Sequence, residues 1–224
     1  MPPKVTIMLF NLNLPTLISR LFVLLTAFAV HEFAHAFVAD RFGDDTPRIN
    51  GRLTLNPIAH LDPMGSLMLV LVGFGWAKPV PINPYVLSRR SSSAVMWVSL
   101  AGPGSNFLMA VFVSLFFRVG LVSVNAALQP VQAGQILPSL DMLLFDFIYI
   151  NLLLMVFNLI PVSPLDGEKI LYYLLPVNGQ RFMDTIRPYG PMILIGLFAL
   201  SFVGFNVIGS IISPAISSLM NLLL

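Results

Sequence analysis

The residues best suited to chemistry lie close together near the N-terminus. His31, Glu32 and His35 form the pattern His-Glu-x-x-His, and they include two of the three histidines and one of the two glutamates of the chain. On a helix, positions i and i+4 share a face, so both imidazoles can bind one metal ion. Glu32 lies beside them and can reach a metal-bound water molecule without being a ligand. This arrangement is typical of zinc proteases.

The chemistry of zinc gives each of these residue types a role. Zinc lowers the pKa of a bound water molecule from about 15.7 to about 7. Glu32 could then accept a proton from that water and pass it to a leaving amine. The simpler alternative is a chance pattern in a core helix. Ionisable groups cost about 2.5–3.5 kcal/mol each at the centre of a membrane span, however, so three of them without a role are unfavourable.

A third metal ligand is expected elsewhere, because catalytic zinc sites usually have three protein ligands and one open position. Few side chains could supply it: His60, Asp62, Asp141, Asp146, Asp166, Glu168 and Asp184. Asp166 is the most distinctive, since it lies in the stretch FNLIPVSPLDGEK, residues 157–169. Two prolines and a glycine interrupt the helix around it, at Pro161, Pro164 and Gly167. Asp-Gly pairs also mark simple turns and Asp caps helices, so the pattern leaves ligand and turn equally open.

The composition indicates a multi-pass membrane protein. Hydrophobic residues make up 57% of the chain and charged residues 10%, with a mean hydropathy of +0.86. Soluble domains have about 25% charged residues. The net charge of +2 is too small to indicate nucleic-acid binding, and the absence of cysteine excludes disulfides, thiolate metal ligands and a cysteine nucleophile. The N-terminus lacks a small-residue cleavage site, so we expect no removable signal peptide.

Apolar stretches of roughly 20 residues are needed to cross a membrane as helices. Four qualify, one between Arg20 and Arg41 and the others at about residues 95–117, 143–164 and 191–212. Residues 64–77 are also apolar, but they are few and contain three glycines. We expect residues 47–84 to be extended, re-entrant or interfacial, with a minor β element. The predicted fold is an all-α multi-pass membrane protein with about four transmembrane helices, in a single domain over residues 1–224.

The positions of lysine and arginine predict which side of the membrane the loops face. If the first span runs inward and residues 64–77 do not cross, nine basic residues are cytoplasmic: Arg41, Arg48, Arg52, Lys78, Arg89, Arg90, Lys169, Arg181 and Arg187. Lys4, Arg20 and Arg118 are then outside. This bias follows the positive-inside rule. It predicts a cell-membrane protein whose active site is nearer the cytoplasmic side.

Several segments together resemble the site-2 protease family of intramembrane zinc metalloproteases. They are HEFAH at residues 31–35, AGPGSN at 101–106 and FNLIPVSPLDG at 157–167, while GRLTLNPIAHLDPMG at 51–65 and GFGWAKPVPINP at 73–84 resemble the short prokaryotic branch. The resemblance covers about residues 20–170, and the pairing of HExxH with LDG is very specific. Many members have Asn-Pro before the aspartate, where this chain has Ser163-Pro164. We expect no PDZ domain of the kind that some members carry.

The resemblance implies an intramembrane zinc endopeptidase with one zinc ion per chain. The ligands that it implies are His31, His35 and Asp166. Glu32 is implied as the general base. Asn158 is implied to face the site and to hydrogen-bond the substrate carbonyl or the tetrahedral intermediate. A neutral amide donor suits an oxyanion that develops in a low-dielectric pocket.

The expected catalytic core spans about residues 17–170, and a C-terminal helix is expected at about 191–212. The expected partners are the lipid bilayer and single-span or multi-span membrane protein substrates. A non-enzymatic zinc-binding transporter or sensor is the alternative, and it would need the ligands but not Glu32. A purely structural helical protein would need no metal. His60 and Asn106 are more simply interpreted as structural residues, in a turn and in an interhelical hydrogen bond.

Overall fold

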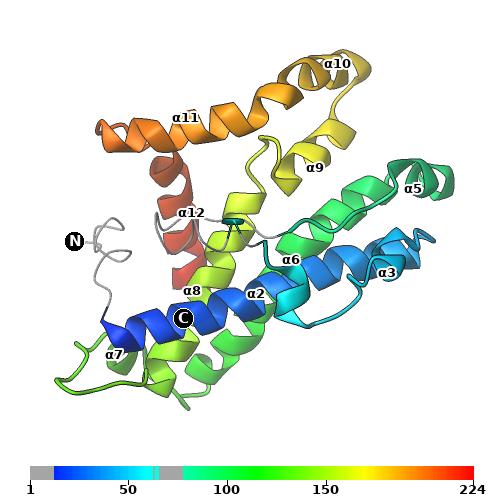
Figure 1. Cartoon of the computed structure of the whole chain (residues 1–224). Helices are drawn as coiled ribbons and strands as arrows, with labels where there is room; N and C mark the ends of the chain where they lie inside the picture. Colours follow the sequence, from blue (N-terminus) through cyan, green and yellow to red (C-terminus); the bar gives the residue numbers. More distant parts are fainter. Residues whose placement is uncertain (1–12, 63, 66–77) are drawn as a thin grey trace.

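Three long helices form the centre of the molecule. The computed structural model describes residues 13–62, 64–65 and 78–224, and no β-strand occurs in these ranges. The central helices are α2 (Leu14–Arg41), α6 (Ala94–Arg118) and α8 (Leu140–Asn158), and each packs against the other two (Figure 1). Within the described residues, these are the helices that are long and apolar enough to cross a membrane. The expected all-helical, multi-pass membrane fold is therefore confirmed.

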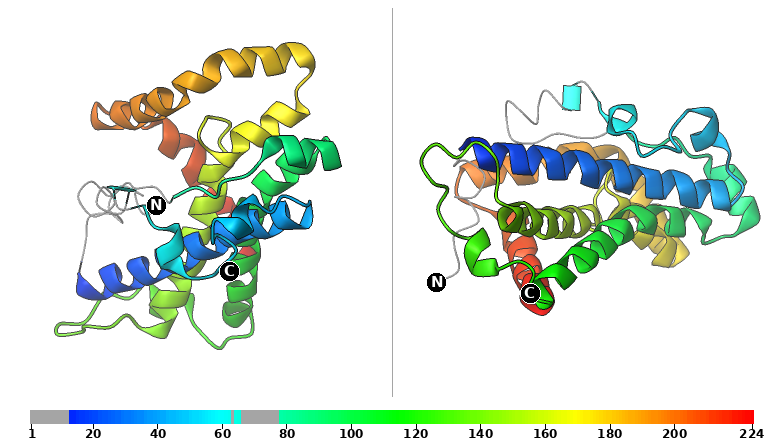
Figure 2. Two further views of the ribbon diagram at one scale, coloured as in Figure 1. Left: turned by 45° about the vertical axis from the view of Figure 1, so that its right-hand side comes forward. Right: turned by 90° about the horizontal axis from the view of Figure 1, so that it is seen from below.

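Shorter helices form the connections and the C-terminal part. They are α3 (Thr46–Ile49), η1 (Pro57–His60), α5 (Pro84–Arg90), α7 (Val124–Ala127), α9 (Asp166–Leu174), α10 (Val177–Ile186), η2 (Arg187–Tyr189), α11 (Gly190–Phe202) and α12 (Val207–Leu223). Of these, α9 packs against α6, and α12 packs against α8. Figure 2 shows from two further directions how α2, α6 and α8 lie together, with α9 and α10 near one end.

Local sequence signals set the ends of the long helices. Asn13 caps α2, because its side-chain oxygen accepts a hydrogen bond from the backbone N–H of Thr16 at 3.0 Å. Pro15 follows in the first turn, where its missing N–H has no partner to lose. Ser139 caps α8 in the same way, through the N–H of Met142. The 28 residues of α2 extend about 42 Å, which exceeds a hydrocarbon core about 30 Å thick.

The three helices meet through small and branched apolar side chains. Val23 and Ala27 of α2 pack against Ile150 and Leu154 of α8, and all four are buried. A second cluster joins α6 to α8 around residues 110–113 and 148–152. In lipid, close van der Waals packing between small residues stabilises helix association, because the surrounding tails are as apolar as the helices.

The predicted C-terminal helix at 191–212 is two helices rather than one. Gly204 adopts a left-handed conformation with φ of 94° directly after α11. The N–H of Gly204 donates to Ser201 O and that of Phe205 to Leu200 O, which is the Schellman helix stop. Asn206 then caps α12 by accepting from the N–H of Gly209. The shorter apolar helix α12 therefore takes the place of the fourth predicted span.

The third predicted span also ends earlier than expected. The helix stops at Asn158 rather than near residue 164. Pro161 and Pro164 follow within the next residues, and proline cannot donate the backbone hydrogen bond that a helix interior requires. The chain turns through this segment and begins α9 at Asp166. Asp166 is therefore the first residue of a new helix.

The segment predicted to be extended, re-entrant or interfacial, residues 47–84, is described except for residue 63 and residues 66–77. Its described part contains η1 and most of α3 and no strand of the expected β element. The chain on the two sides of residues 66–77 lies close together, since the N–H of Lys78 donates to His60 O at 2.8 Å. The N–H of Asn83 donates to the buried carboxylate of Asp44, just after α2, at 2.6 Å. The chain thus enters and leaves residues 66–77 at neighbouring points, and Asn83 brings it back to the end of α2 before α5 and α6 begin. In Figure 1, α2 and α8 run in one direction along the bundle and α6 in the other.

This arrangement predicts which loops share a side of the membrane. The ribbon views place α5 and α10 toward one end of the bundle and α7 toward the other (Figures 1 and 2). Because the chain has no native cysteine, single cysteines can report the sidedness. Cysteines at the exposed positions Ser92 and Asn178 should react with an impermeant maleimide from one side, and a cysteine at Gln129 from the other. Labelling of Ser92→Cys and Asn178→Cys from opposite sides would contradict this topology.

Candidate metal centre

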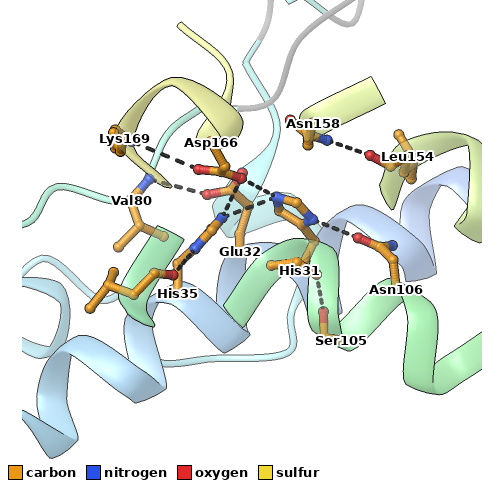
Figure 3. A network of polar contacts seen from close by, with 12 residues as sticks. His31, Glu32, His35, Val80, Ser105, Asn106, Leu154, Asn158, Asp166 and Lys169 are labelled. Carbon is orange, nitrogen blue, oxygen red and sulfur yellow. Dashed lines mark hydrogen bonds and ion pairs between the residues drawn. The ribbon is translucent and has the colours of Figure 1, made fainter. Parts of the chain in front are cut away.

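Two helices distant in sequence bring three ligand atoms together. His31 and His35 lie one turn apart on α2, and Asp166 begins α9. The Nε2 atoms of the two imidazoles are 3.0 Å apart. Asp166 Oδ2 lies 3.1 Å from His35 Nε2 and 3.3 Å from His31 Nε2. All three side chains are buried, and together they form a group that could hold a metal ion (Figure 3).

The spacing of these atoms fits a zinc ion. Zinc binds histidine nitrogen and carboxylate oxygen at about 2.0–2.2 Å, usually with tetrahedral geometry. Ligand atoms at that distance and angle are about 3.3–3.5 Å apart, close to the observed separations of 3.0–3.3 Å. Three ligands leave the fourth position open, as a catalytic site requires.

The Nδ1 atoms of both imidazoles, on the side of each ring away from the metal position, lie against oxygen atoms of α6. His35 Nδ1 lies 2.6 Å from the backbone oxygen of Val98 on α6. A carbonyl oxygen only accepts, so Nδ1 must carry the proton, and the Nε2 of His35 then presents a lone pair to the other two ligand atoms. His31 Nδ1 lies 2.6 Å from Asn106 Oδ1, also on α6. Partners of this kind orient metal-binding histidines.

Gly102 makes the close approach of α6 possible. A Cβ atom built on Gly102 would overlap the Nε2 atoms of both His31 and His35. The two nitrogens therefore point at a space that only glycine leaves free. Gly102 lies in the AGPGSN segment, residues 101–106, which is one of the segments that carry the family resemblance. The sequence carried no signal that one of its glycines faces the metal-binding atoms.

Glu32 is directed toward the same space without joining the three convergent atoms (Figure 3). Its side chain is buried, with 9% of its surface exposed. One carboxylate oxygen accepts a hydrogen bond from the backbone N–H of Val80 at 3.1 Å. The backbone of Val80 thus holds one oxygen of the glutamate. Val80 could not be found from the sequence, because it acts through its backbone.

Asp166 divides its two oxygens between the histidines and a lysine. Its Oδ2 faces the imidazoles, and its Oδ1 lies 3.8 Å from Lys169 Nζ. The ionised form of this carboxyl is the form that binds a metal ion.

The residues after Asp166 hold α9 in place. A Cβ on Gly167 would overlap the backbone oxygen of Leu159, so glycine lets α9 begin directly beside the end of α8. Glu168 is 4% exposed and accepts two hydrogen bonds from Arg187, at 2.9 and 2.7 Å. This ion pair ties α9 to η2. The Asp-Gly-Glu sequence thus supplies a candidate ligand, a close contact and an anchor in successive positions.

The remaining sequence candidates for a third ligand have partners elsewhere. Each carboxylate or imidazole accepts from or pairs with a group outside the convergent site: His60 with Thr54 O, Asp62 with Gly65 N, Asp141 with Ser123 N, Asp146 with Ser19 Oγ, Glu168 with Arg187, and Asp184 with Tyr172 and Arg187. Among the described residues, Asp166 is the acidic side chain that joins the histidines.

Asn158 lies at the end of α8, on the stretch that leads to Asp166. Its Nδ2 donates to Leu154 O in its own helix at 2.9 Å (Figure 3). The side chain is partly buried and keeps a second N–H beyond this bond. Its expected contact with substrate stays a prediction.

Comparison with known proteins gives a consistent result. Residues 19–200 match the sequence profile of peptidase family M50. The chain is 41% identical over 175 residues to the Bacillus subtilis protein named "Putative zinc metalloprotease YwhC". The aligned region covers 78% of this chain and 77% of that protein. It is 33% identical over 179 residues to the Mycolicibacterium smegmatis protein named "Putative zinc metalloprotease Rip2". That aligned region covers 77% of this chain and 63% of the relative. No solved structure matches the chain.

Two neighbouring glycines allow a matched test of the metal centre. Gly102→Ala should displace both Nε2 atoms and reduce the bound zinc from about one ion per chain to near zero. Gly104→Ala is the control, because nothing lies within 4 Å of the Cβ that it adds to the same helix. Elemental analysis of the purified variants measures the zinc content. Full zinc occupancy in Gly102→Ala would contradict the assigned centre.

Proposed function

The chain belongs to peptidase family M50, the site-2 protease family of zinc metalloproteases, and we propose that it hydrolyses peptide bonds in or near transmembrane segments of other membrane proteins. As a member it is a zinc metalloprotease of the membrane. The observation that carries the proposal is the meeting of His31, His35 and Asp166 beside Glu32 in one buried site. We assign the first three as zinc ligands and Glu32 as general base.

The depth of the site supports cleavage within the membrane. His35 lies six residues before Arg41, the last residue of α2, and His31 lies ten before it. At 1.5 Å per residue the site is about 9–15 Å from that end of the helix. The same end of the bundle carries the basic residues of α5, Arg89 and Arg90. By the positive-inside rule we assign this end to the cytoplasm and the protein to the cell membrane.

The mechanism requires a base that is held but is not a ligand. When bound, zinc lowers the pKa of a water molecule to about 7 and polarises the substrate carbonyl. Glu32 accepts a proton from the attacking water as the water oxygen bonds to the carbonyl carbon. It transfers that proton to the leaving nitrogen as the C–N bond breaks. One product then ends in a carboxyl group and the other begins with an amine.

The Val80 N–H has a defined part in this mechanism. It donates to one oxygen of Glu32 at 3.1 Å, which leaves the other oxygen for the water molecule. Because the donor is a backbone N–H, proline is the substitution at Val80 that would remove it.

The substrate must be partly unwound before cleavage. The carbonyl groups of a transmembrane helix are engaged in its own hydrogen bonds. A carbonyl can reach the site only after those bonds open locally. We therefore expect substrates to be single-span or multi-span membrane proteins with helix-breaking residues near the cleaved bond. Asn158 is proposed to donate to the carbonyl oxygen as negative charge develops there.

Substitution of Glu32 separates catalysis from metal binding. Glu32→Gln keeps an oxygen that can accept from Val80, so the fold and the zinc content should be retained. Proteolysis should fall by at least about 10²–10⁴-fold, because the amide cannot act as a base. Cleavage is measured by mass spectrometry on a panel of single-span membrane proteins, beside the zinc content. Activity within threefold of the unmodified chain would rule out the role of Glu32.

Substitution of Asn158 tests the proposed oxyanion donor. Asn158→Ala should retain zinc and lower kcat by about 10²–10³-fold, the usual effect of losing one such donor. The hydrogen bond that it loses within α8 is a single helix-internal contact, so the thermal unfolding temperature should change little. A fall in zinc content that matched the loss of turnover would instead make Asn158 a structural residue.

A further inference from the structure

Two asparagines are completely buried between the membrane-spanning helices. Asn106 on α6 and Asn151 on α8 have no exposed surface. An amide buried in an apolar medium without hydrogen bonds strongly destabilises a protein. Asn151 stands in the strongly apolar run of α8 and makes no contact with the ligand atoms themselves. Its presence therefore needs a reason.

Hydrogen bonds connect these asparagines to His31 in one continuous chain. Asn151 Nδ2 donates to Phe147 O in α8 at 2.8 Å. Asn106 Nδ2 donates to Asn151 Oδ1 at 2.8 Å. Asn106 Oδ1 lies 2.6 Å from His31 Nδ1. This series of hydrogen bonds thus runs from the backbone of α8, through Asn106 on α6, to a candidate metal ligand on α2.

The donor and the acceptor of every hydrogen bond in this series follow from the first bond, between Asn151 and Phe147 O. Phe147 O is a carbonyl oxygen and only accepts, so the Asn151 amide must turn its NH₂ group toward it. The Asn151 oxygen then faces Asn106 and requires a donor, which turns the Asn106 NH₂ toward it. The Asn106 oxygen therefore faces His31, whose Nδ1 must carry the proton. His31 Nε2 is left with its lone pair, directed at the metal position.

We propose that Asn106 and Asn151 are positioning residues that fix the tautomer of His31, so that a backbone carbonyl of α8 determines the zinc affinity of the site. This inference rests on the proposed assignment of His31 as a ligand. Asn106 alone could not fix the tautomer, because an amide can present either its oxygen or its NH₂ group. With the NH₂ toward Nδ1, the proton of His31 would move to Nε2 and block the metal. Asn151 fixes the orientation of the Asn106 amide, because its oxygen accepts only from the Asn106 NH₂ group.

His35 shows why one histidine needs the relay and the other does not. Its Nδ1 contacts the backbone oxygen of Val98 directly, at 2.6 Å. A backbone carbonyl cannot turn over, so a single bond fixes that ring. His31 faces a side-chain amide instead and depends on a second amide to orient it.

The first experiment compares two adjacent buried residues of α8 in the full-length protein. Asn151→Leu removes the donor and acceptor of the relay, and Leu152→Ala is the control, since Leu152 is equally buried and makes no polar contact with the relay. Zinc affinity is measured by competition with a chelator on the folded, monodisperse fraction. We expect a 10–100-fold weaker zinc affinity in Asn151→Leu, the usual effect of losing an outer partner. Leu152→Ala should lower the unfolding temperature with a change in affinity of less than threefold.

The second experiment replaces the reversible amide with a group that only accepts. An ionised carboxylate at position 106 accepts from His31 whichever way it is turned, so Asn106→Asp should retain zinc while Asn106→Leu loses it. In the Asn106→Asp background, Asn151→Leu should cost less than threefold in zinc affinity. A packing role for Asn151 would give the same loss in both backgrounds. That result, or equal affinities in Asn151→Leu and Leu152→Ala, would overturn the relay.

The tautomer can also be observed without metal. The chain has only three histidines, so histidine-selective ¹⁵N labelling gives a spectrum simple enough to assign. Metal-free protein should show His31 protonated at Nδ1, and Asn151→Leu should shift it toward Nε2 protonation. An unchanged tautomer would overturn the relay. His31→Ala is the reference variant. If it retained full zinc, the assignment of His31 as a ligand in the proposed function would fail. If His31→Ala lost zinc and Asn151→Leu lost none, the relay alone would be overturned.

Discussion

The meeting of three electron-rich atoms in a buried place is the constraint on which the rest of the structure depends. Two imidazole nitrogens and one carboxylate oxygen lie 3.0–3.3 Å apart. With the protons on the outer nitrogens of the rings, these atoms have no hydrogen to share among themselves. They would repel one another, and a low-dielectric surrounding screens that repulsion poorly. A cation at their centre converts the repulsion into binding, which is why the arrangement suits a zinc ion.

The backbone has to come unusually close for this meeting to occur. Gly102 lets α6 lie directly against the two histidines, and Gly167 lets α9 begin beside the last carbonyls of α8. Beyond the site, the ion pair of Glu168 and Arg187 anchors α9. The position of Asp166 therefore depends on contacts before and after it in the chain. A ligand at a helix start needs such support, because the turn that precedes it contains two prolines and no regular structure.

Polar groups inside the helix bundle obey the same rule as the metal centre. In an apolar medium a polar group is tolerated when it is paired, and an unpaired one is costly. Asn106 is paired with Asn151, and the Ser19 hydroxyl donates to Asp146 at 2.6 Å. The first pair lies between α6 and α8 and the second between α2 and α8. Interhelical bonds of this kind set the rotation of each helix about its axis, and that rotation directs the histidines inward.

The sequence by itself determined those features that depend on neighbouring residues. The i, i+4 spacing put His31 and His35 on one face of a helix, and composition identified the three stretches that form the long apolar helices. The predicted single helix at 191–212 missed the break at Gly204, because the apolar run is continuous there, although glycine is the usual residue at a helix stop. Pattern alone could not decide whether Asp166 was a ligand or a turn residue, because the histidine that it contacts lies 131 residues away.

Only the tertiary structure brings Asp166 to the two histidines, places Gly102 against them, and connects Asn151 to His31 through Asn106. Each of these depends on how closely and in what rotation helices pack. Periodicity and composition describe one helix at a time, whereas a metal centre is formed by atoms of several helices within a few ångströms. The physical reason is that packing against distant segments, and not local preference, places those atoms.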